Sequence, residues 1–108
     1  MGLQATQSQF AIAAAKLILH AESLGFEVTL GDAYRDERCN YGAPNSKHRQ
    51  RLAIDLNLFL DGRYLTDTAD HEQLGLYWES VGGIWGGRFG GTYAPEKQDG
   101  NHYEWPDP

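Results

Sequence analysis

The stretch "NSKHRQRLAIDLNLFLDG", residues 45–62, decides the fold because it contains a clear strand pattern. Five apolar residues fall on one face at period two, as in a strand with one buried side: Leu52, Ile54, Leu56, Leu58 and Leu60. Asp61-Gly62 predicts a tight hairpin turn before a second short strand, Arg63–Leu65. Asp55 lies on the other face of the first strand, where a half-buried carboxylate needs a partner that compensates its desolvation.

Regular elements are also predicted on both sides of this hairpin. Apolar residues at spacings of three and four predict a helix from Phe10 to Leu24, ended by Gly25, and alternation predicts a strand over residues 26–30. A second helix is predicted within residues 66–83, and short extended pieces at 84–85 and 102–104. One face of that second helix holds His71, Leu74, Trp78 and Val81. We therefore expect a single α+β domain over residues 1–108, with a small antiparallel sheet and flanking helices.

Composition excludes several classes of protein. The chain has 9 basic and 15 acidic residues, a net charge of −6, and no extended basic stripe, which argues against a nucleic-acid partner. The single cysteine, Cys39, excludes an intrachain disulfide and is compatible with a reducing cytoplasm. We find neither a signal peptide nor an apolar run long enough to insert into a membrane, and we expect a cytoplasmic monomer.

Two histidines and one aspartate suggest a metal site. His48, Asp55 and His102 supply three ligands of nitrogen and oxygen type, the set that a catalytic zinc site uses with its fourth position open to water. Asp99 lies three residues before His102, close enough to act as a proton acceptor. Taken singly, each residue also has an ordinary interpretation: a hydrogen-bonded surface histidine, a carboxylate paired with an arginine, and a member of an aromatic cluster.

The remaining histidines and tryptophans are interpreted mainly as packing residues. His20 and His71 lie on predicted helical faces, where packing or exposure is the common role. The tryptophans are large enough to fill the centre of a small domain, and Trp85, followed by two glycines, is also a candidate for the wall of a substrate groove.

Two motifs resemble those of a known family. "SKHRQRLAID" resembles the S-x-H-x-x-G-x-A-x-D signature of the M15 zinc peptidases, which include D-Ala-D-Ala carboxypeptidases, the VanX/VanY branch and phage L-alanyl-D-glutamate endopeptidases. "IWGGRF" and then "DGNHYEW" resemble the second half of the phage-type pattern, and "DAYR" matches the stretch where the family places an arginine. The resemblance runs in the family's order from about residue 30 to residue 105 and implies a hedgehog/DD-peptidase-like fold.

Site roles follow from this resemblance. It implies that His48, Asp55 and His102 bind one zinc ion per chain and that Asp99 is the general acid and base. Arg35 takes the position of the arginine that helps to stabilise the oxyanion, and Ser46 that of a residue near the substrate. We also expect acceptors such as Glu104 or loop carbonyls to hold the second ring nitrogens of the ligand histidines.

One position departs from the family pattern. Arg51 stands where the signature has glycine. Because arginine rarely adopts the backbone angles that glycine tolerates, we expect an ordinary turn there, with unchanged ligand spacing and an altered substrate fit.

The resemblance implies a zinc peptidase that cuts peptidoglycan stem peptides, most like a phage or prophage endolysin that acts on the cell wall after release from the cytoplasm. Alternatives are a D,D- or L,D-carboxypeptidase of the same family and a non-catalytic zinc-containing binding module of the same fold. A structural subunit of a phage particle is a third possibility, and it would need no water-accessible metal.

Overall fold

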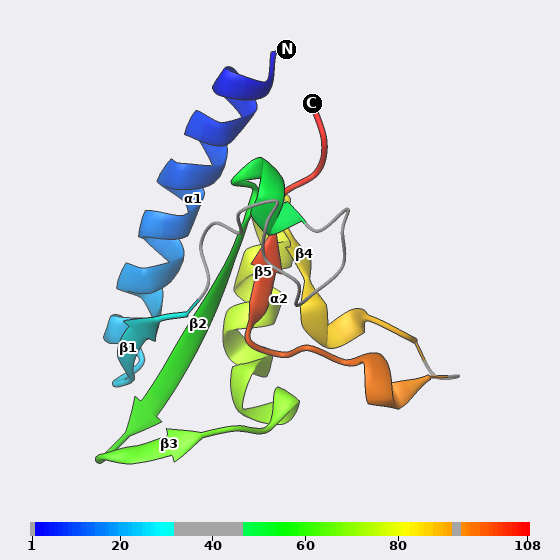
Figure 1. The fold of residues 1–108 in the computed structure, drawn as a ribbon. Helices are drawn as coiled ribbons and strands as arrows, with labels where there is room; N and C mark the ends of the chain where they lie inside the picture. The colour runs from blue at the N-terminus through cyan, green and yellow to red at the C-terminus, as the bar shows by residue number, and fades with distance from the viewer. Residues whose placement is uncertain (1, 32–46, 92–93) are drawn as a thin grey trace.

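The structure is a computed structural model that describes residues 2–31, 47–91 and 94–108; the side chains of His48 and Arg49 are outside that description. The described residues form two α-helices and a five-stranded antiparallel sheet (Figure 1). This confirms the predicted α+β class. Four of the strands follow the order β1-β2-β5-β4, and β3 also pairs with β2.

The N-terminal helix is longer than its apolar pattern indicates. Helix α1 spans Leu3–Ser23, and its buried stripe extends one turn before Phe10 to Thr6. Leu24 is the C-cap and is exposed, and Gly25 follows at φ +94°, a left-handed conformation that suits glycine at a helix end. The chain then enters β1, Glu27–Leu30, which pairs with β2.

The central hairpin forms as predicted. Strand β2 spans Ala53–Leu60 and β3 spans Arg63–Leu65, joined by Asp61 at φ +52° and Gly62 at φ +80°. Positive φ at both turn residues is the geometry of a two-residue hairpin loop that matches the twist of the strands. Leu60, at the end of β2, is 37% exposed, so the buried side of the strand ends at Leu58.

The second helical segment is divided in two. A 3-10 turn, η2, spans Thr68–His71, and α2 spans Glu72–Ser80. Asp67 begins it with a capping box, in which the side chains of Asp67 and Asp70 each accept a hydrogen bond from the other's backbone N–H. His71, Leu74 and Trp78 are buried as predicted, but Val81 is 41% exposed because the helix has already ended before it.

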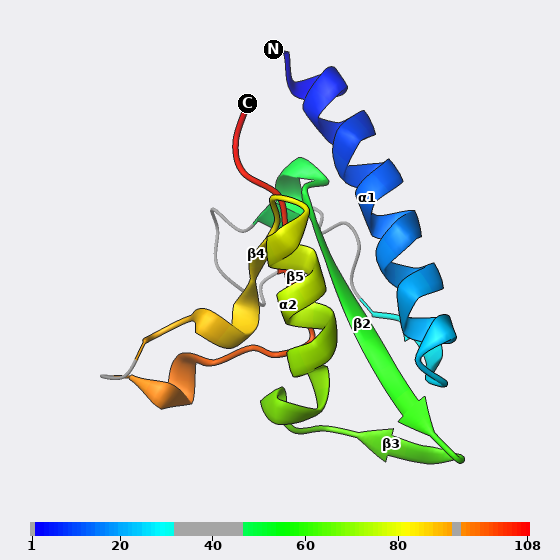
Figure 2. The same cartoon turned by 180° about the vertical axis from the view of Figure 1, so that it is seen from behind.

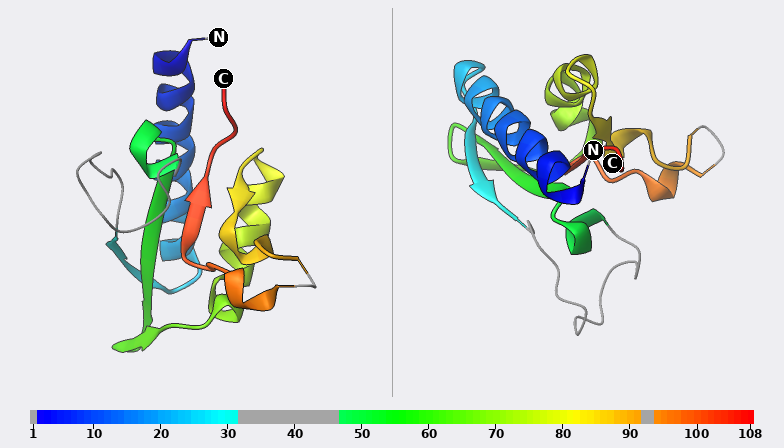
Figure 3. Two further views of the ribbon diagram at one scale, coloured as in Figure 1. Left: turned by 45° about the vertical axis from the view of Figure 1, so that its right-hand side comes forward. Right: turned by 90° about the horizontal axis from the view of Figure 1, so that it is seen from above.

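Both helices cover the same face of the sheet (Figures 2 and 3). Strand β4, Ile84–Trp85, and strand β5, His102–Glu104, complete the sheet beside α2. The core lies between the helices and β2 and β5, and its fully buried members include Leu17, Leu52, Leu56, Leu58, Leu74, Trp78 and Tyr103. The opposite face of β2 and β5 is not covered by either helix, and it displays Asp55 and His102.

None of the helices in the described parts of the chain has both the length and the apolar character needed to cross a membrane.

Candidate metal and catalytic site

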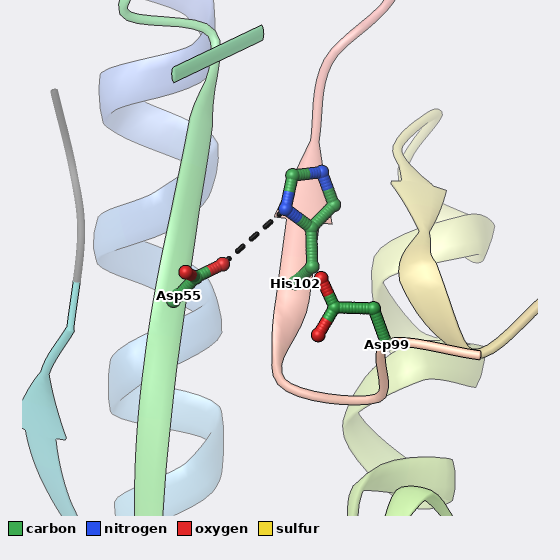
Figure 4. Close-up of side chains that lie close together, drawn as sticks. All are labelled: Asp55, Asp99 and His102. Atoms are coloured by element: carbon green, nitrogen blue, oxygen red, sulfur yellow. Dashed lines mark hydrogen bonds and ion pairs between the residues drawn. The ribbon is translucent and has the colours of Figure 1, made fainter. Parts of the chain in front are cut away.

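The site begins with the register between β2 and β5. Asp55 pairs directly with His102, and both side chains lie on the open face of the sheet (Figure 4). The Asp55 Oδ1 atom lies 3.2 Å from His102 Nδ1. Alternation along the two strands therefore supplies the partner that a carboxylate inside a strand requires.

The second nitrogen of the same ring is also held. His102 Nε2 lies 2.8 Å from Glu104 Oε1, two residues along β5 on the same face. Of the two acceptors that the sequence left open for His102, Glu104 and a loop carbonyl, the structure shows Glu104. This contact fixes the ring so that Nδ1, not Nε2, faces Asp55.

The electrostatics of His102 favour a positive charge between the two carboxylates. Burial opposes charge on the imidazole and lowers its pKa, but hydrogen bonds to Asp55 and Glu104 and their charges outweigh burial and raise the pKa of His102 to about 9. The ring is therefore protonated at neutral pH, with its proton on Nδ1 directed at Asp55. A cation bound at Nδ1 would take the place of that proton.

Asp99 reaches this pair from the turn that precedes β5. Its backbone N–H donates to Gly86 O at 2.9 Å, and the His102 N–H donates to Asp99 O at 3.0 Å. Only glycine fits at position 86, because a Cβ there would lie 2.2 Å from Asp99 O and 2.8 Å from the Cβ of His102. Gly86, which directly follows β4 (Ile84–Trp85), therefore lets this segment approach the turn that carries Asp99.

Asp55, Asp99 and His102 form a group that can hold a metal ion: one ligand atom from each lies within 4.8 Å of the others. Ligand atoms about 2 Å from a shared zinc ion lie roughly 3–4 Å from one another, so small side-chain rotations are enough to close this group around an ion. Nitrogen and carboxylate oxygen are ligands that zinc accepts, and the donor set fits. Asp99 is exposed, whereas His102 is buried, which suits Asp99 to contact with solvent.

The segment that carries His48 lies immediately before β2. This 3-10 turn, η1, spans Lys47–Gln50 and is fastened at both of its ends. Lys47 forms an ion pair with Asp107 near the C-terminus, and the Gln7 side chain of α1 donates to Gln50 O at 2.8 Å. The His48 side chain is outside the described part of the structure, so its role as a ligand stays a prediction.

The expectation of an ordinary turn at Arg51 is wrong. Arg51 has φ +58°, in the left-handed region that glycine adopts readily and arginine rarely does. The turn between η1 and β2 is fixed on both sides, because the Leu52 N–H donates to Lys47 O at 2.9 Å and the Trp105 N–H donates to Leu52 O at 2.8 Å. These contacts hold Arg51 in a conformation that glycine adopts more readily.

Among the other predicted site residues, Trp85 is described and is not part of this group, and the roles of Arg35 and Ser46 stay predictions. Arg35 and Ser46 lie outside the described residues, as does Cys39. Trp85 is only 4% exposed, and its indole N–H donates to Gly100 O at 2.8 Å. Its observed contact is therefore with the loop that carries Asp99, which it supports from the core side.

A buried polar pair behind the site was not predicted from the sequence. The Tyr103 hydroxyl oxygen lies 2.7 Å from His71 Nδ1, and both residues are buried. Alternation along β5 contains the signal for it, because Tyr103 must face away from His102 and toward the predicted helix that carries His71. His71 is thus a packing residue, as expected, but one with a specific hydrogen bond.

Comparison with known proteins identifies the family of this chain. No curated protein matches the chain. A family model, Peptidase_M15_4, described as D-alanyl-D-alanine carboxypeptidase, matches residues 40–105, a segment that runs from before His48 through Asp55 and Asp99 to just beyond His102. More than half of the chain is included in this match, and the chain belongs to the M15 peptidase family.

Proposed function

We propose that this domain is a zinc-dependent peptidase that hydrolyses peptidoglycan stem peptides, acting as a phage or prophage endolysin that cuts between L-alanine and D-glutamate. The observation that carries the proposal is the meeting of Asp55, Asp99 and His102 on the open face of the sheet. Family membership supports a peptide substrate. In this proposal the enzyme accumulates in the cytoplasm and reaches the wall after a separate membrane-permeabilising protein releases it.

The ligands in this proposal are His48, Asp55 and His102, with Glu104 holding the His102 ring. Zinc supplies Lewis-acid chemistry when bound: it polarises a carbonyl oxygen and makes water more acidic. Asp99 accepts the proton of the attacking water and then returns a proton to the leaving amine. Arg35 stabilises the oxyanion, and Ser46 lies near the substrate.

The decisive experiment measures the loss of turbidity of permeabilised Gram-negative cells, with and without a chelator. Asp99→Asn keeps the size of the side chain and removes the proton acceptor, so lysis should slow by about 10²–10⁴-fold, the usual contribution of general acid–base catalysis. Asp61→Asn is the matched control. It removes an exposed hairpin carboxylate at φ +52°, a conformation that asparagine tolerates, and should leave lysis unchanged.

Metal content separates this function from its rivals. We expect close to one zinc per chain by elemental analysis, lost in His48→Ala and retained in Asp99→Asn and Arg35→Ala. Arg35→Ala should lower kcat by roughly 10²–10³-fold, as removal of an oxyanion donor does. A zinc-loaded wild type that cleaves no muropeptide would favour the non-catalytic binding module, and a protein without zinc would contradict both.

A second candidate function is a D,D- or L,D-carboxypeptidase, which the description of the matching family model favours. Mass spectrometry of products from purified muropeptides distinguishes the two. Release of a single C-terminal residue identifies a carboxypeptidase, and cleavage after the first residue of the stem identifies the endopeptidase.

A further inference from the structure

A pocket lies beside Asp99, at a break in the sheet. Strands β5 and β3 both pair with the same edge of β2, β5 opposite residues 53–55 and β3 opposite residues 58–60. Between them, a pocket of about 270 Å³ opens at Leu56. We call it the gap pocket; its lining includes Asp67, Thr68, His71, Gln98 and Asp99.

The protonation of His71 follows from its neighbour. Tyr103 is fully buried, and a tyrosine hydroxyl carries its proton at pH 7. The hydroxyl donates that proton to His71 Nδ1, 2.7 Å away. Burial lowers the pKa of His71 to about 4 and outweighs the charge of Asp70, so the ring is neutral at pH 7. Its one proton is therefore on Nε2.

The Nε2–H group of His71 is a second hydrogen-bond donor of the ring. The side chain lines the gap pocket and the residue is only 2% exposed, yet within the described ranges Nε2 has no hydrogen-bond partner. A buried donor without an acceptor costs free energy. A group that enters the pocket with an acceptor oxygen would remove that cost.

The charge of the pocket limits what this group can be. Two acidic residues, Asp67 and Asp99, line the pocket, and no described lysine or arginine does. A carboxylate would meet two like charges there. A carboxamide fits better: its oxygen can accept from His71 Nε2, and its N–H groups can donate to the Thr68 hydroxyl or to the lone pairs that Asp67 keeps beyond its helix cap.

We propose that the gap pocket is a substrate subsite that takes a neutral carboxamide on a residue adjoining the cleaved bond and discriminates against a free carboxylate at that position. This inference rests on the proposed peptidase function, because Asp99 joins the pocket to the reacting bond. A carboxyl group outside the main chain of a peptide substrate can be free or amidated. The pocket selects the amidated form.

The test uses two synthetic stem peptides that differ only in a carboxylate or a carboxamide on the residue after the cleaved bond. Wild-type protein should show kcat/KM at least about tenfold higher for the amide, since unfavourable like-charge contacts are typically worth that or more. Asp67→Asn should bring the ratio toward one. It removes a charge from the pocket while keeping a helix cap, because asparagine caps as well as aspartate does. Asp61→Asn, outside the pocket, should leave the ratio at the wild-type value.

A binding measurement on metal-free protein separates failure of the subsite from failure of the function. The ¹⁵N resonance of His71 Nε2 should shift when the amide peptide is added and stay in place with the carboxylate peptide. If neither peptide is cut but the shift occurs, the subsite stands without the proposed function. If both peptides are cut equally and nothing shifts, the pocket holds an ordered water only and the inference is overturned. No cleavage and no shift would overturn both, and a stronger response to the carboxylate would also overturn the inference.

Discussion

Strands β2 and β5 have two faces with opposite properties, although both faces come from alternate residues of the same short segments. One face is dry: Ile54, Leu56 and Tyr103 pack under the helices with Trp78. The other face is polar, with Asp55 and His102 in contact and Glu104 beside them. Residues that support the core and residues that form the candidate site therefore alternate along the same strand. Substitutions at neighbouring positions should affect either stability or site chemistry, but not both equally.

The largest effect is expected in the core, where α2 packs against the buried face of the strands. Trp78 is fully buried, and its indole N–H donates to Glu104 O at 2.9 Å. Trp78→Ala should destabilise the domain by about 3–5 kcal/mol, because it leaves a large cavity, and this is a large fraction of the stability of a small domain. Urea denaturation measures it. Leu76→Ala, at an exposed position of the same helix, should change stability by less than about 1 kcal/mol; equal losses would contradict the assignment of faces.

The buried histidine behind the site predicts a loss of stability in acid. The pKa of His71 is lowered to about 4 from an ordinary value of 6.5, so His71 favours folding above pH 6.5 and loses this contribution as the pH falls toward 4. The loss should be up to about 3 kcal/mol. Thermal melts between pH 7 and pH 4 measure it. His71→Asn should be less stable at pH 7 and show a smaller loss in acid; an unchanged pH dependence would mean that His71 is already charged in the folded state.

The polar face predicts the opposite sign in metal-free protein. Because the pKa of His102 is raised to about 9, its contribution to stability is complete below pH 6.5 and is lost as the pH rises through 9. Asp55→Asn removes a charge-assisted hydrogen bond, typically worth about 1.5–3 kcal/mol, and should lower that pKa. NMR titration of the His102 ring with chelator present measures it. A pKa that stays at its wild-type value would show that Glu104 alone holds the proton.

The smallest effect on stability is expected at Arg51, in the turn that precedes β2. Arg51→Gly should stabilise the domain by about 1 kcal/mol, because it relieves a left-handed conformation at a non-glycine residue. Arg63→Gly, the same substitution inside β3, should instead destabilise by about 0.5–1 kcal/mol. Paired denaturation curves test the contrast, and effects of the same sign would contradict the backbone assignment.

The hairpin and the helices were predicted from the spacing of apolar residues and from turn residues. Alternation over 52–60 and the Asp61-Gly62 turn identified the hairpin, and the spacing of Phe10, Ala14, Leu17 and Ala21 identified the buried stripe of α1. The end of α2 was placed one residue late, because Val81 matches the apolar spacing although it is the C-cap and the helix ends at Ser80. Apolar spacing does not reveal where backbone hydrogen bonds stop.

Features that depend on register and on distant contacts were only partly accessible. The spacing of Asp55, Asp99 and His102 suggested that they act together, but only the pairing of β2 with β5 brings them side by side. The choice of Glu104 over a loop carbonyl depends on which way the His102 ring turns. The conformation of Arg51 was predicted wrongly because residue type was weighed alone, whereas backbone contacts from Lys47 and Trp105 determine the turn.

The contacts that Gln7 and Asp107 make with η1 have a practical consequence for protein engineering. Residues near both chain ends, Gln7 and Asp107, contact the turn that carries His48, and the two ends lie at the same side of the domain in Figure 1. A purification tag or a wall-targeting module fused after Pro108 is separated from Asp107 by that one residue. Tag position is therefore an experimental variable in every assay of metal binding, and a cleavable tag provides the cleaner preparation.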